Sequence, residues 1–296
     1  MEALSLEIPS GSIYGYLGPN GAGKTTSLRM MTGILRSDSG TLSVLGASDP
    51  ADVKQQLGYL PEEKGLYKKM RVLDFIVYLG RLKGMTGVAA KKRALALLEQ
   101  FDLAARARDR CDSLSKGLGQ KVQIIATLIH DPQLIVLDEP FSGLDPVNVE
   151  LIRSTIIELK RQHRTIVFST HVMEQAEQIC DSVLLINQGH KILDGPLSEI
   201  RSSTVSNLII DYEGDGSVLH RLPGVERVND AGKHAELSLK PGTDTQQLLH
   251  SLLPHLTIRR FDTRETSLHE IFIRAITTDE FTTNGNQAQD ISSEFS

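Results

Sequence analysis

The sequence predicts an α/β fold in which a parallel sheet carries helices, followed by a small α+β domain. A glycine-rich octet at residues 18–25 lies between an apolar run and a helical pattern, and a second apolar run, residues 134–138, ends in carboxylates. After about residue 205 the pattern of strands and helices changes. Alternation of strands and helices is typical of a parallel sheet with helices on its faces. We therefore expect one domain over residues 1–204 and a second over residues 205–276.

The octet has the composition of a P-loop, the phosphate-binding turn between a strand and a helix. It consists of Gly18, Pro19, Asn20, Gly21, Ala22, Gly23, Lys24 and Thr25, and Thr26 follows it. The glycines let the backbone curl so that successive N–H groups point at one anion, and the positive end of the next helix adds to the attraction. Lys24 can then reach the β- and γ-phosphates of a nucleotide, and the Thr25 hydroxyl can bind Mg²⁺.

The second apolar run supplies two acids for the same chemistry. Residues 134–140 read Leu-Ile-Val-Leu-Asp-Glu-Pro, which suits a central parallel strand buried on both faces. Open α/β sheets bind ligands at the carboxyl ends of their strands. We expect Asp138 to hold Mg²⁺, directly or through water, and Glu139 to polarise the attacking water as general base. The alternative is a buried strand with two acids at its solvated end.

Three further motifs follow along the chain. A Leu-Ser-Lys-Gly-Leu segment, residues 114–118, precedes a predicted helix over 120–129, and a Ser-Gly-Leu-Asp segment, residues 142–145, follows the two acids. The β-pattern of residues 165–170 ends at His171. A lone histidine is more often structural or merely exposed. At the end of a β-run that follows the acidic strand, however, it is expected at the same edge of the sheet.

In this order the motifs resemble those of the ATP-binding subunits of ABC transporters, over roughly residues 1–200. The resemblance implies a P-loop NTPase of the ABC ATPase type, with a helical subdomain at about residues 72–130 that faces a membrane partner. Apolar residues at helical spacing in 72–83 and 89–101 are consistent with such a subdomain.

The resemblance also implies roles for single residues. The segment 18–26 would contact ATP, and Lys24 would be its catalytic lysine. Ser115 and Gly117 match the ATP contacts of the family's signature motif, and Asp145 lies in the loop that links two ATP sites. His171 matches the switch residue that contacts the γ-phosphate.

Three positions depart from the commonest family pattern. Lys116 and Leu118 stand in the signature motif where glycine and glutamine are usual. Glu62 stands after a proline where the family usually places a glutamine that touches Mg²⁺ and the attacking water. Because a carboxylate is a hard oxygen ligand, we expect Glu62 to bind Mg²⁺ in place of that glutamine.

The N-terminal segment is a further departure. Residues 5–8 match a later strand of the family, so the first strand and the aromatic residue that stacks on adenine have no counterpart in this sequence. Stacking of a base on an aromatic ring contributes about 1–3 kcal/mol. We therefore expect weaker ATP binding and poorer discrimination between ATP and GTP than is usual.

The C-terminal region follows another pattern. We expect strands over residues 208–212, 236–239 and 256–261 and helices over residues 246–253 and 268–276. This α+β region resembles the extension on ATP-binding subunits of bacterial drug- and sodium-extrusion exporters. Residues 277–296 are polar and acidic, and we predict that they are disordered.

Composition limits the alternatives. The chain has 296 residues, 40% of them hydrophobic, and a net charge of −5. The acidic tail carries most of this charge, so nothing in the composition indicates a nucleic-acid partner. No apolar stretch approaches the ~20 residues needed to cross a bilayer, so membrane work requires a partner. The two cysteines, Cys111 and Cys180, form no metal or redox spacing.

The chain carries one P-loop and one signature motif. In the family these motifs of a single subunit do not meet on one ATP, so a second subunit completes each site. The resemblance thus implies a homodimeric ATPase that drives export through a separate integral-membrane permease, held in the cytoplasm on the inner face of the cell membrane. The alternative is an ATP-binding regulator with impaired turnover. Repair ATPases place a long coiled coil between these motifs, and residues 26–133 carry no sustained heptads. The cargo is not encoded in these motifs.

Overall fold

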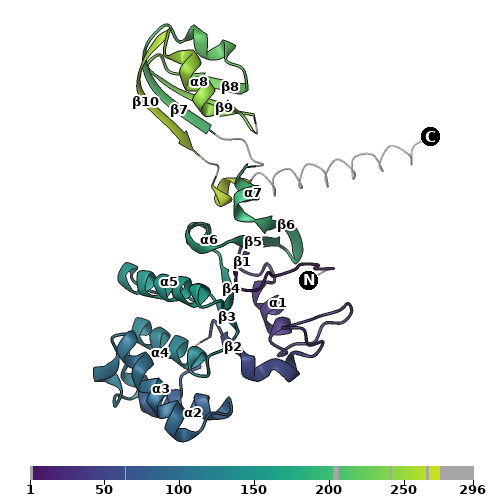
Figure 1. Ribbon diagram of the computed structural model, residues 1–296, viewed down its shortest axis with the longest axis vertical. Coiled ribbons are helices and arrows are strands. Elements are labelled where there is room, and N and C mark those ends of the chain that lie inside the picture. The colour runs from purple at the N-terminus through teal and green to yellow at the C-terminus, as the bar shows by residue number, and fades with distance from the viewer. Residues whose placement is uncertain (1–2, 64, 203–206, 241, 265–266, 274–296) are drawn as a thin grey trace, which may run out of the picture. The chain divides into compact units, whose positions relative to one another are not determined.

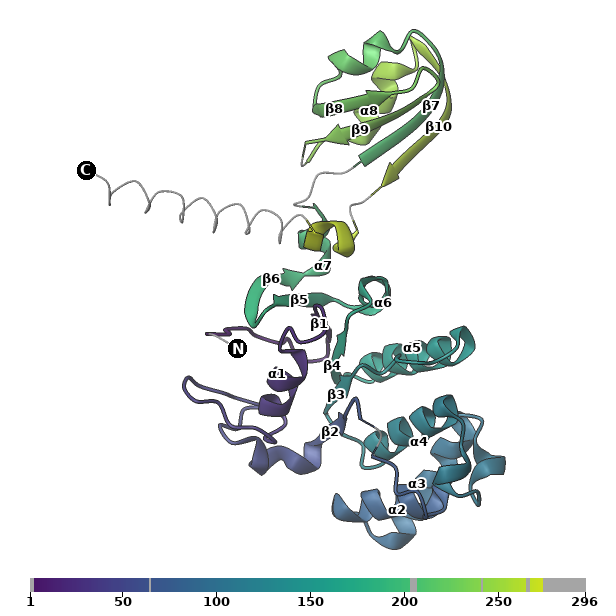
Figure 2. The same ribbon diagram turned by 180° about the vertical axis from the view of Figure 1, so that it is seen from behind.

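The computed structural model describes residues 3–63, 65–202, 207–240, 242–264 and 267–273 (Figures 1 and 2). The chain divides into two compact units, residues 1–194 and 195–296. The expected boundary after residue 204 is therefore displaced, because helix α7 (Leu197–Ser202) belongs to the second unit. The sequence pattern changes only where the next strand begins, and this explains the difference.

A six-stranded sheet forms the centre of the first unit, in the order β2-β3-β4-β1-β5-β6. Its strands are β1 (Ile13–Leu17), β2 (Leu57–Leu60), β3 (Leu134–Asp138), β4 (Thr165–Thr170), β5 (Ser182–Asn187) and β6 (His190–Pro196). Strands β2, β3, β4, β1 and β5 pair in parallel. Every residue of β1, β3 and β4 is buried, which explains their unbroken apolar runs. The predicted α/β fold is confirmed.

The register of this sheet brings the predicted motifs to one edge. Leu17 pairs with Thr170, and Asp138 pairs with Ser169. The segments that follow β1, β3 and β4 therefore leave the sheet side by side.

Helices pack around this sheet. They are α1 (Lys24–Met31), α2 (Val72–Leu82), α3 (Gly87–Gln100), α4 (Lys116–Leu128), α5 (Pro146–Arg161) and α6 (Met173–Ile179), with 3-10 turns over Pro50–Gln56, Ala104–Arg106 and Cys111–Ser113. Helices α2, α3 and α4 lie together at one end of the unit, away from α1 (Figure 1), as the helical subdomain predicted at residues 72–130. Helix α4 begins at Lys116 rather than at Gln120, because Ser115 caps it. None of the helices described is both long and apolar enough to cross a bilayer.

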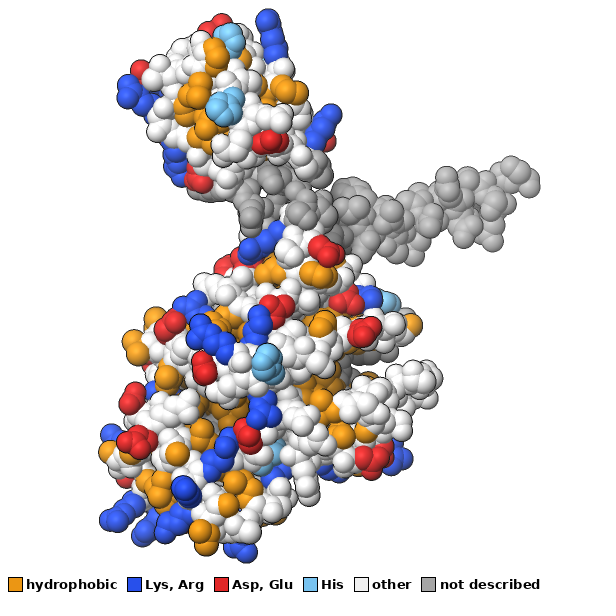
Figure 3. Space-filling view, in the orientation of Figure 1, with side chains coloured by type: hydrophobic (Ala, Val, Ile, Leu, Met, Phe, Trp, Pro, Cys, Tyr) orange, Lys and Arg blue, Asp and Glu red, His pale blue; other side chains and the backbone are white. Residues whose placement is uncertain are grey.

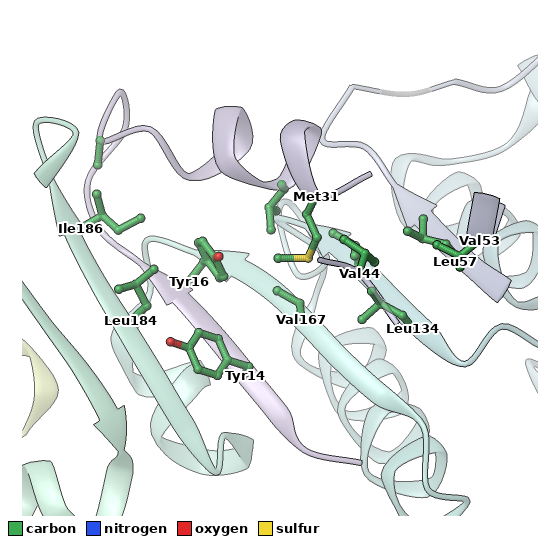
Figure 4. Packing of buried hydrophobic residues seen from close by; sticks show 13 residues of the cluster. Tyr14, Tyr16, Met31, Val44, Val53, Leu57, Leu134, Val167, Leu184 and Ile186 are labelled. Atoms are coloured by element: carbon green, nitrogen blue, oxygen red, sulfur yellow. The ribbon is translucent and has the colours of Figure 1, made fainter. Parts of the chain in front are cut away.

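The core lies between α1 and the sheet. Figure 4 shows Tyr14 and Tyr16 of β1 in one cluster with Met31 of α1, Val167 of β4 and Leu184 of β5. Burial raises the pKa of both tyrosines, so their hydroxyls stay neutral at any physiological pH.

The helical subdomain is joined to the sheet beside β2. Lys83, the residue after α2, donates hydrogen bonds to the carbonyl oxygens of Lys54 and Leu57, at 2.7 and 2.8 Å. His130, close after α4, donates from Nε2 to the same Leu57 oxygen at 3.1 Å. The two contacts with Leu57 are half-buried, and they join the end of α2 and the segment after α4 to the start of β2.

A second connection runs through Asp131. One oxygen of this carboxylate lies 2.8 Å from Arg93 of α3, and the other lies 2.9 Å from Arg164, which precedes β4. The Asp131 side chain is 50% exposed, so water screens both ion pairs.

The expected strand over residues 5–8 is wrong. These residues belong to no strand, although Leu6 and Ile8 pack against the core. In the described part of the N-terminal region, an isolated bridge joins Val44 to Ala47. A strand requires a hydrogen-bonded partner along its length, and no described residue supplies one for residues 5–8.

The second unit contains a four-stranded antiparallel sheet in the order β10-β7-β9-β8. Its elements are β7 (Asn207–Gly214), a 3-10 turn (Gly216–Arg221), β8 (Val225–Asp230), β9 (His234–Leu239), α8 (Thr245–Leu252) and β10 (Leu256–Arg264). Leu208, Ile210 and Tyr212 alternate along β7 and form the core with Leu248 and Leu252 of α8.

Two predicted segments of this unit reach beyond the described residues. Residues 268–273 are helical, and the remainder of the helix expected over 268–276 lies outside the described residues. The tail, residues 277–296, also lies outside them.

Candidate nucleotide-binding site

The loop between β1 and α1 has the backbone of a phosphate-binding turn. Gly18 has φ +151°, and a Cβ at this position would lie 2.1 Å from the carbonyl oxygen of Ile186 in β5, so only glycine fits. Gly23 precedes α1 with φ 105° and offers no side-chain cap. The first N–H groups of α1 therefore have no side-chain acceptor, and they remain available to an anion.

Lys24 is buried inside this loop. Its Nζ donates to the carbonyl oxygens of Gly18, at 2.7 Å, and Pro19, at 3.1 Å, and lies 3.8 Å from Glu139 Oε1. Burial lowers the pKa of Lys24, and the charges of Glu139, Asp138 and Glu62 oppose that shift. The lysine is thus surrounded by the acids that the sequence predicts at this site.

Glu62 follows β2 and is exposed. Leu60 pairs with Leu137, so the segment that contains Glu62 leaves the sheet at the same edge as Asp138 and Glu139. The charge of Glu62 also acts to raise the pKa of Lys24. Thr25 and Thr26 lie in the first turn of α1 and are partly buried. The structure thereby brings residues from three segments of the chain together at the carboxyl edge of the sheet.

Asp138 is fully buried at the end of β3. Its Oδ1 accepts a hydrogen bond of 2.5 Å from the Ser169 hydroxyl, and Ser169 Oγ accepts one of 3.0 Å from the Glu139 N–H. Among the described residues, Asp138 Oδ2 has no hydrogen-bond partner. A buried carboxylate oxygen without a donor is costly, and its position is suited to a cation.

Ser169 is a site residue that the sequence analysis missed. The only signal was its place two positions before His171 on β4, and this becomes informative once the pairing of β4 with β3 is known.

Glu139 has an unusual backbone. Its φ is +49°, in the left-handed region that residues with side chains avoid. His171, directly after β4, holds this side chain in place, with Nδ1 2.9 Å from Glu139 Oε1. The His171 side chain is 48% exposed and the Glu139 side chain is 8% exposed. Solvent therefore reaches the histidine, while the glutamate is almost fully buried.

The signature residues occupy another place in the chain. Ser115 caps α4, accepting from Leu118 N–H at 3.4 Å, and Gly117 lies in the first turn of that helix. Asp145 caps α5, accepting from Asn148 N–H at 3.0 Å and from the Asn148 side chain. These hydrogen bonds lower the pKa of Asp145.

No hydrogen bond or ion pair among the described residues joins these caps to Lys24. The chain therefore brings together the P-loop, the two acids, Glu62 and His171. None of the described hydrogen bonds or ion pairs joins Ser115, Gly117 or Asp145 to that group.

Two family models match this chain. A family model described as "ABC transporter" matches residues 1–142, and one described as "ATP-binding protein DrrA1-3-like, C-terminal domain" matches residues 195–276. The second match begins where the structure divides the chain.

Relatives extend over nearly the whole length. The uncharacterized ABC transporter ATP-binding protein YhaQ of Bacillus subtilis is 39% identical over 277 residues, 93% of this chain and 93% of that protein. Nod factor export ATP-binding protein I of Burkholderia lata is 33% identical over 281 residues, 93% of this chain and 91% of that one. A solved ATP-binding subunit of an ABC transporter superposes with a TM-score of 0.61 and 30% identity, covering 66% of this chain and 83% of that chain. The chain therefore belongs to the ATP-binding subunits of ABC transporters, which bind and hydrolyse ATP to drive transport with membrane permease partners.

Proposed function

We propose that this chain is the motor subunit of an exporter, and that two copies close around ATP to drive a separate permease. The observation that carries the proposal is the convergence of Lys24, Asp138, Glu139 and His171 at the carboxyl edge of one sheet. A degenerate regulator would not need to keep a buried cation, a buried acid and an oriented base together.

The donor set fits Mg²⁺ beside the phosphates. Asp138 Oδ2 is a buried oxygen without a described partner, and Thr25 and Glu62 would add a hydroxyl and a carboxylate. Protein sites commonly hold Mg²⁺ through one or two carboxylates, with substrate phosphates and water as further ligands. The absence of a cluster of three or more His, Cys, Asp or Glu side chains among the described residues is therefore no obstacle. When bound, Mg²⁺ would neutralise charge on the β- and γ-phosphate oxygens.

Lys24 would bind the phosphates directly. Its ammonium group already lies inside the loop, held by the Gly18 and Pro19 carbonyls. Phosphate oxygens entering the loop would replace these neutral acceptors with charged ones, and charge-assisted hydrogen bonds are stronger. The N–H groups of residues 18–26 would complete the cradle.

Glu139 would act as general base. A water molecule attacks the γ-phosphorus and gives a proton to the Glu139 carboxylate. The bond from phosphorus to the oxygen shared with ADP breaks, and that oxygen leaves with ADP. His171 would orient Glu139 through the 2.9 Å contact and would approach the γ-phosphate from its exposed side.

A second copy would complete each site. Ser115 and Gly117 have no contact with Lys24 in their own chain, while the α4 N-terminus offers backbone N–H groups to an anion. In a head-to-tail pair, these groups and Asp145 would face the nucleotide held by the other P-loop. Loss of the γ-phosphate would then remove charge from the interface and let the pair open.

The helical subdomain would meet the permease. Tyr67 and Tyr78 are 52% and 40% exposed and pack edge to face, with ring centroids 5.7 Å apart, and Leu82 is 64% exposed. Figure 3 shows hydrophobic side chains interleaved with Lys and Arg over this end of the unit. An apolar patch rimmed by charges is typical of a protein interface.

The direction of transport follows from relatives alone. One of them is named as a Nod factor export protein, and the C-terminal model is named for DrrA-like ATP-binding proteins. We infer export on that basis. A subunit so placed would be peripheral to the membrane, on its cytoplasmic face.

The proposal is tested by the mass of the Glu139→Gln variant in light scattering. This variant should bind ATP without hydrolysing it, so Mg-ATP should double its mass, whereas ADP should leave a monomer. Adding Lys24→Ala should abolish both ATP binding and dimerisation, and adding Ser115→Arg should abolish dimerisation alone. A variant that binds ATP and stays monomeric would contradict the two-subunit site. A wild-type chain that dimerises with ATP but does not hydrolyse it would be the regulator instead.

A further inference from the structure

The first turn of α4 contacts the loop that follows Glu139. The side chain of Lys116 lies across the Cα atom of Gly143: a Cβ placed on Gly143 would lie 2.1 Å from Lys116 Nζ and 2.5 Å from its Cε. Gly143 has φ +68°, a left-handed conformation suited to glycine. The end of the lysine side chain, its Nζ and Cε, therefore occupies the space that a side chain at position 143 would need.

Two neighbouring contacts reinforce this one. Gln120 donates from Nε2 to the Pro140 carbonyl at 3.3 Å. A Cβ on Gly117 would lie 3.4 Å from the side-chain nitrogen of Asn148, just after the same loop. The first turns of α4 and residues 140–148 thus form one packed unit.

The loop transmits its position to Glu139. Ser142 N–H donates to the Glu139 carbonyl at 3.1 Å, so the loop turns back on the glutamate within a few residues. Glu139 is held with φ +49°, a conformation that persists only where its surroundings enforce it. A shift of Gly143 would therefore change the placement of the Glu139 carboxylate.

Packing alone holds Lys116 at this place. Among the described residues no acid contacts its ammonium group, and the first turn of α4 contains no acidic residue. A cation at the positive end of a helix is electrostatically unfavourable. An anion that reaches the α4 N-terminus would stabilise this turn and fix the lysine on Gly143.

We propose that Lys116 is a positioning residue that links the partner's nucleotide to Glu139 of its own chain. The inference rests on the proposed function, in which the α4 N-terminus faces the nucleotide held by the second copy. A nucleotide at that interface orders the first turn of α4 and keeps Lys116 packed against Gly143. The loop that contains Gly143 then fixes the position of the Glu139 carboxylate. Each site then hydrolyses best when the other is filled.

Mixed dimers of the full chain test this assignment. Two differently tagged copies are co-expressed and purified through both tags, with Glu139→Gln in one copy so that only the other hydrolyses ATP. Lys116→Ala is placed either on the copy with intact Glu139 or on the Glu139→Gln copy. The proposal predicts a fall of about three- to tenfold in kcat, with KM for ATP unchanged, only when both intact Glu139 and Lys116→Ala are on one copy. Loss in the other arrangement alone would mean that Lys116 contacts the nucleotide across the interface. The proposal would be overturned by loss of activity in that other arrangement alone, by equal loss in both arrangements, or by no loss in either.

Further variants separate positioning from folding. Lys116→Met keeps the stem over Gly143 without the charge, and it should retain kcat within about twofold. Lys121→Ala, on the same helix, is the matched control for removal of a lysine. Neither Lys116→Ala nor Lys116→Met should lower the melting temperature, because Lys116 is exposed. If Lys116→Met loses as much activity as Lys116→Ala, the packing contact is not the link. A reference dimer of wild-type and Glu139→Gln chains must form with ATP and hydrolyse it, and its failure would contradict the proposed function itself.

Discussion

The Ser169 hydroxyl donates a hydrogen bond of 2.5 Å to Asp138 Oδ1 across the pairing of β4 with β3. The same hydroxyl oxygen accepts from the Glu139 N–H, so one side chain fixes two consecutive acids. Both Ser169 and Asp138 are fully buried. The orientation of the acid that would hold Mg²⁺ is thus set by a neighbouring strand.

Replacing Ser169 with alanine should therefore weaken both the fold and the metal dependence. Asp138 Oδ1 and the Glu139 N–H would lose their partner inside the protein, which costs about 1–3 kcal/mol of unfolding free energy. Urea denaturation measures that loss, and ATPase activity titrated with Mg²⁺ should show a higher half-saturating concentration. Ser12→Ala is the control, because Ser12 is also buried but donates to the Pro9 carbonyl away from the site. Equal effects of the two substitutions would refute a role for Ser169 in the site.

Glu62 should set the Mg²⁺ requirement of turnover. Glu62→Gln removes a charged oxygen ligand while preserving size, so we expect a higher half-saturating Mg²⁺ concentration and an altered rate of hydrolysis. The adjacent Glu63 is exposed as well, and Glu63→Gln is the matched control for loss of charge alone. An unchanged Mg²⁺ dependence and rate in Glu62→Gln would show that Glu62 does not replace the family's glutamine.

Gly18→Ala should destabilise the protein more than Gly11→Ala does. A Cβ at Gly18 would lie 2.1 Å from the Ile186 carbonyl oxygen, whereas one at Gly11 would meet nothing within 4 Å. Both residues have positive φ, at +151° and +72°, so both variants carry backbone strain of about 1 kcal/mol. Gly18→Ala should add a clash and cost about 3 kcal/mol or more in thermal or chemical denaturation. Similar losses in the two variants would contradict the close approach of β5.

His130 should make the fold sensitive to mild acid. Burial, aided by the charge of Lys83, lowers the pKa of His130 to about 4. The unfolded chain binds a proton there below about pH 6.5, while the folded chain stays neutral until about pH 4. Stability is therefore lost as pH falls through this window, by up to about 2 kcal/mol after allowance for solvent screening.

Melting temperatures between pH 7 and pH 4 check this expectation. His130→Gln keeps a donor for the Leu57 carbonyl but cannot titrate, so its melting temperature should fall less with acid than that of the wild type. His163→Asn is the control, because His163 is exposed and has φ +60°, a conformation that asparagine tolerates. If the melting temperature of His130→Gln falls with acid as steeply as that of the wild type, His130 is not the source of the acid sensitivity.

The sequence predicted the strands well wherever an apolar run ended in a motif. The apolar runs before Gly18, Asp138 and His171 each form a central strand. A central strand of a parallel sheet is buried on both faces, so an unbroken apolar run is typical of it. Prediction was weaker where partners mattered. Ser169 gained its role from the strand beside it, and residues 5–8 have the composition of a strand without a paired neighbour.

The second unit shows the same limit. Strand β8 was not predicted, because none of its residues is fully buried and it carries no apolar run. Its pairing with β9 defines it instead. The start of α4 was predicted too late because Gly117 and Gly119 are poor helix formers, although Ser115 caps the helix.

Two sets of polar contacts join the helical subdomain to the sheet region, and they differ in their exposure to water. Lys83 and His130 donate half-buried hydrogen bonds to the Leu57 carbonyl at the start of β2. Asp131, in contrast, forms solvent-exposed ion pairs with Arg93 and Arg164. Exposed ion pairs contribute only about 0.2–1 kcal/mol each and weaken as salt is added. Added salt should therefore weaken the contacts of Asp131 with Arg93 and Arg164 more than the hydrogen bonds that Lys83 and His130 donate to Leu57.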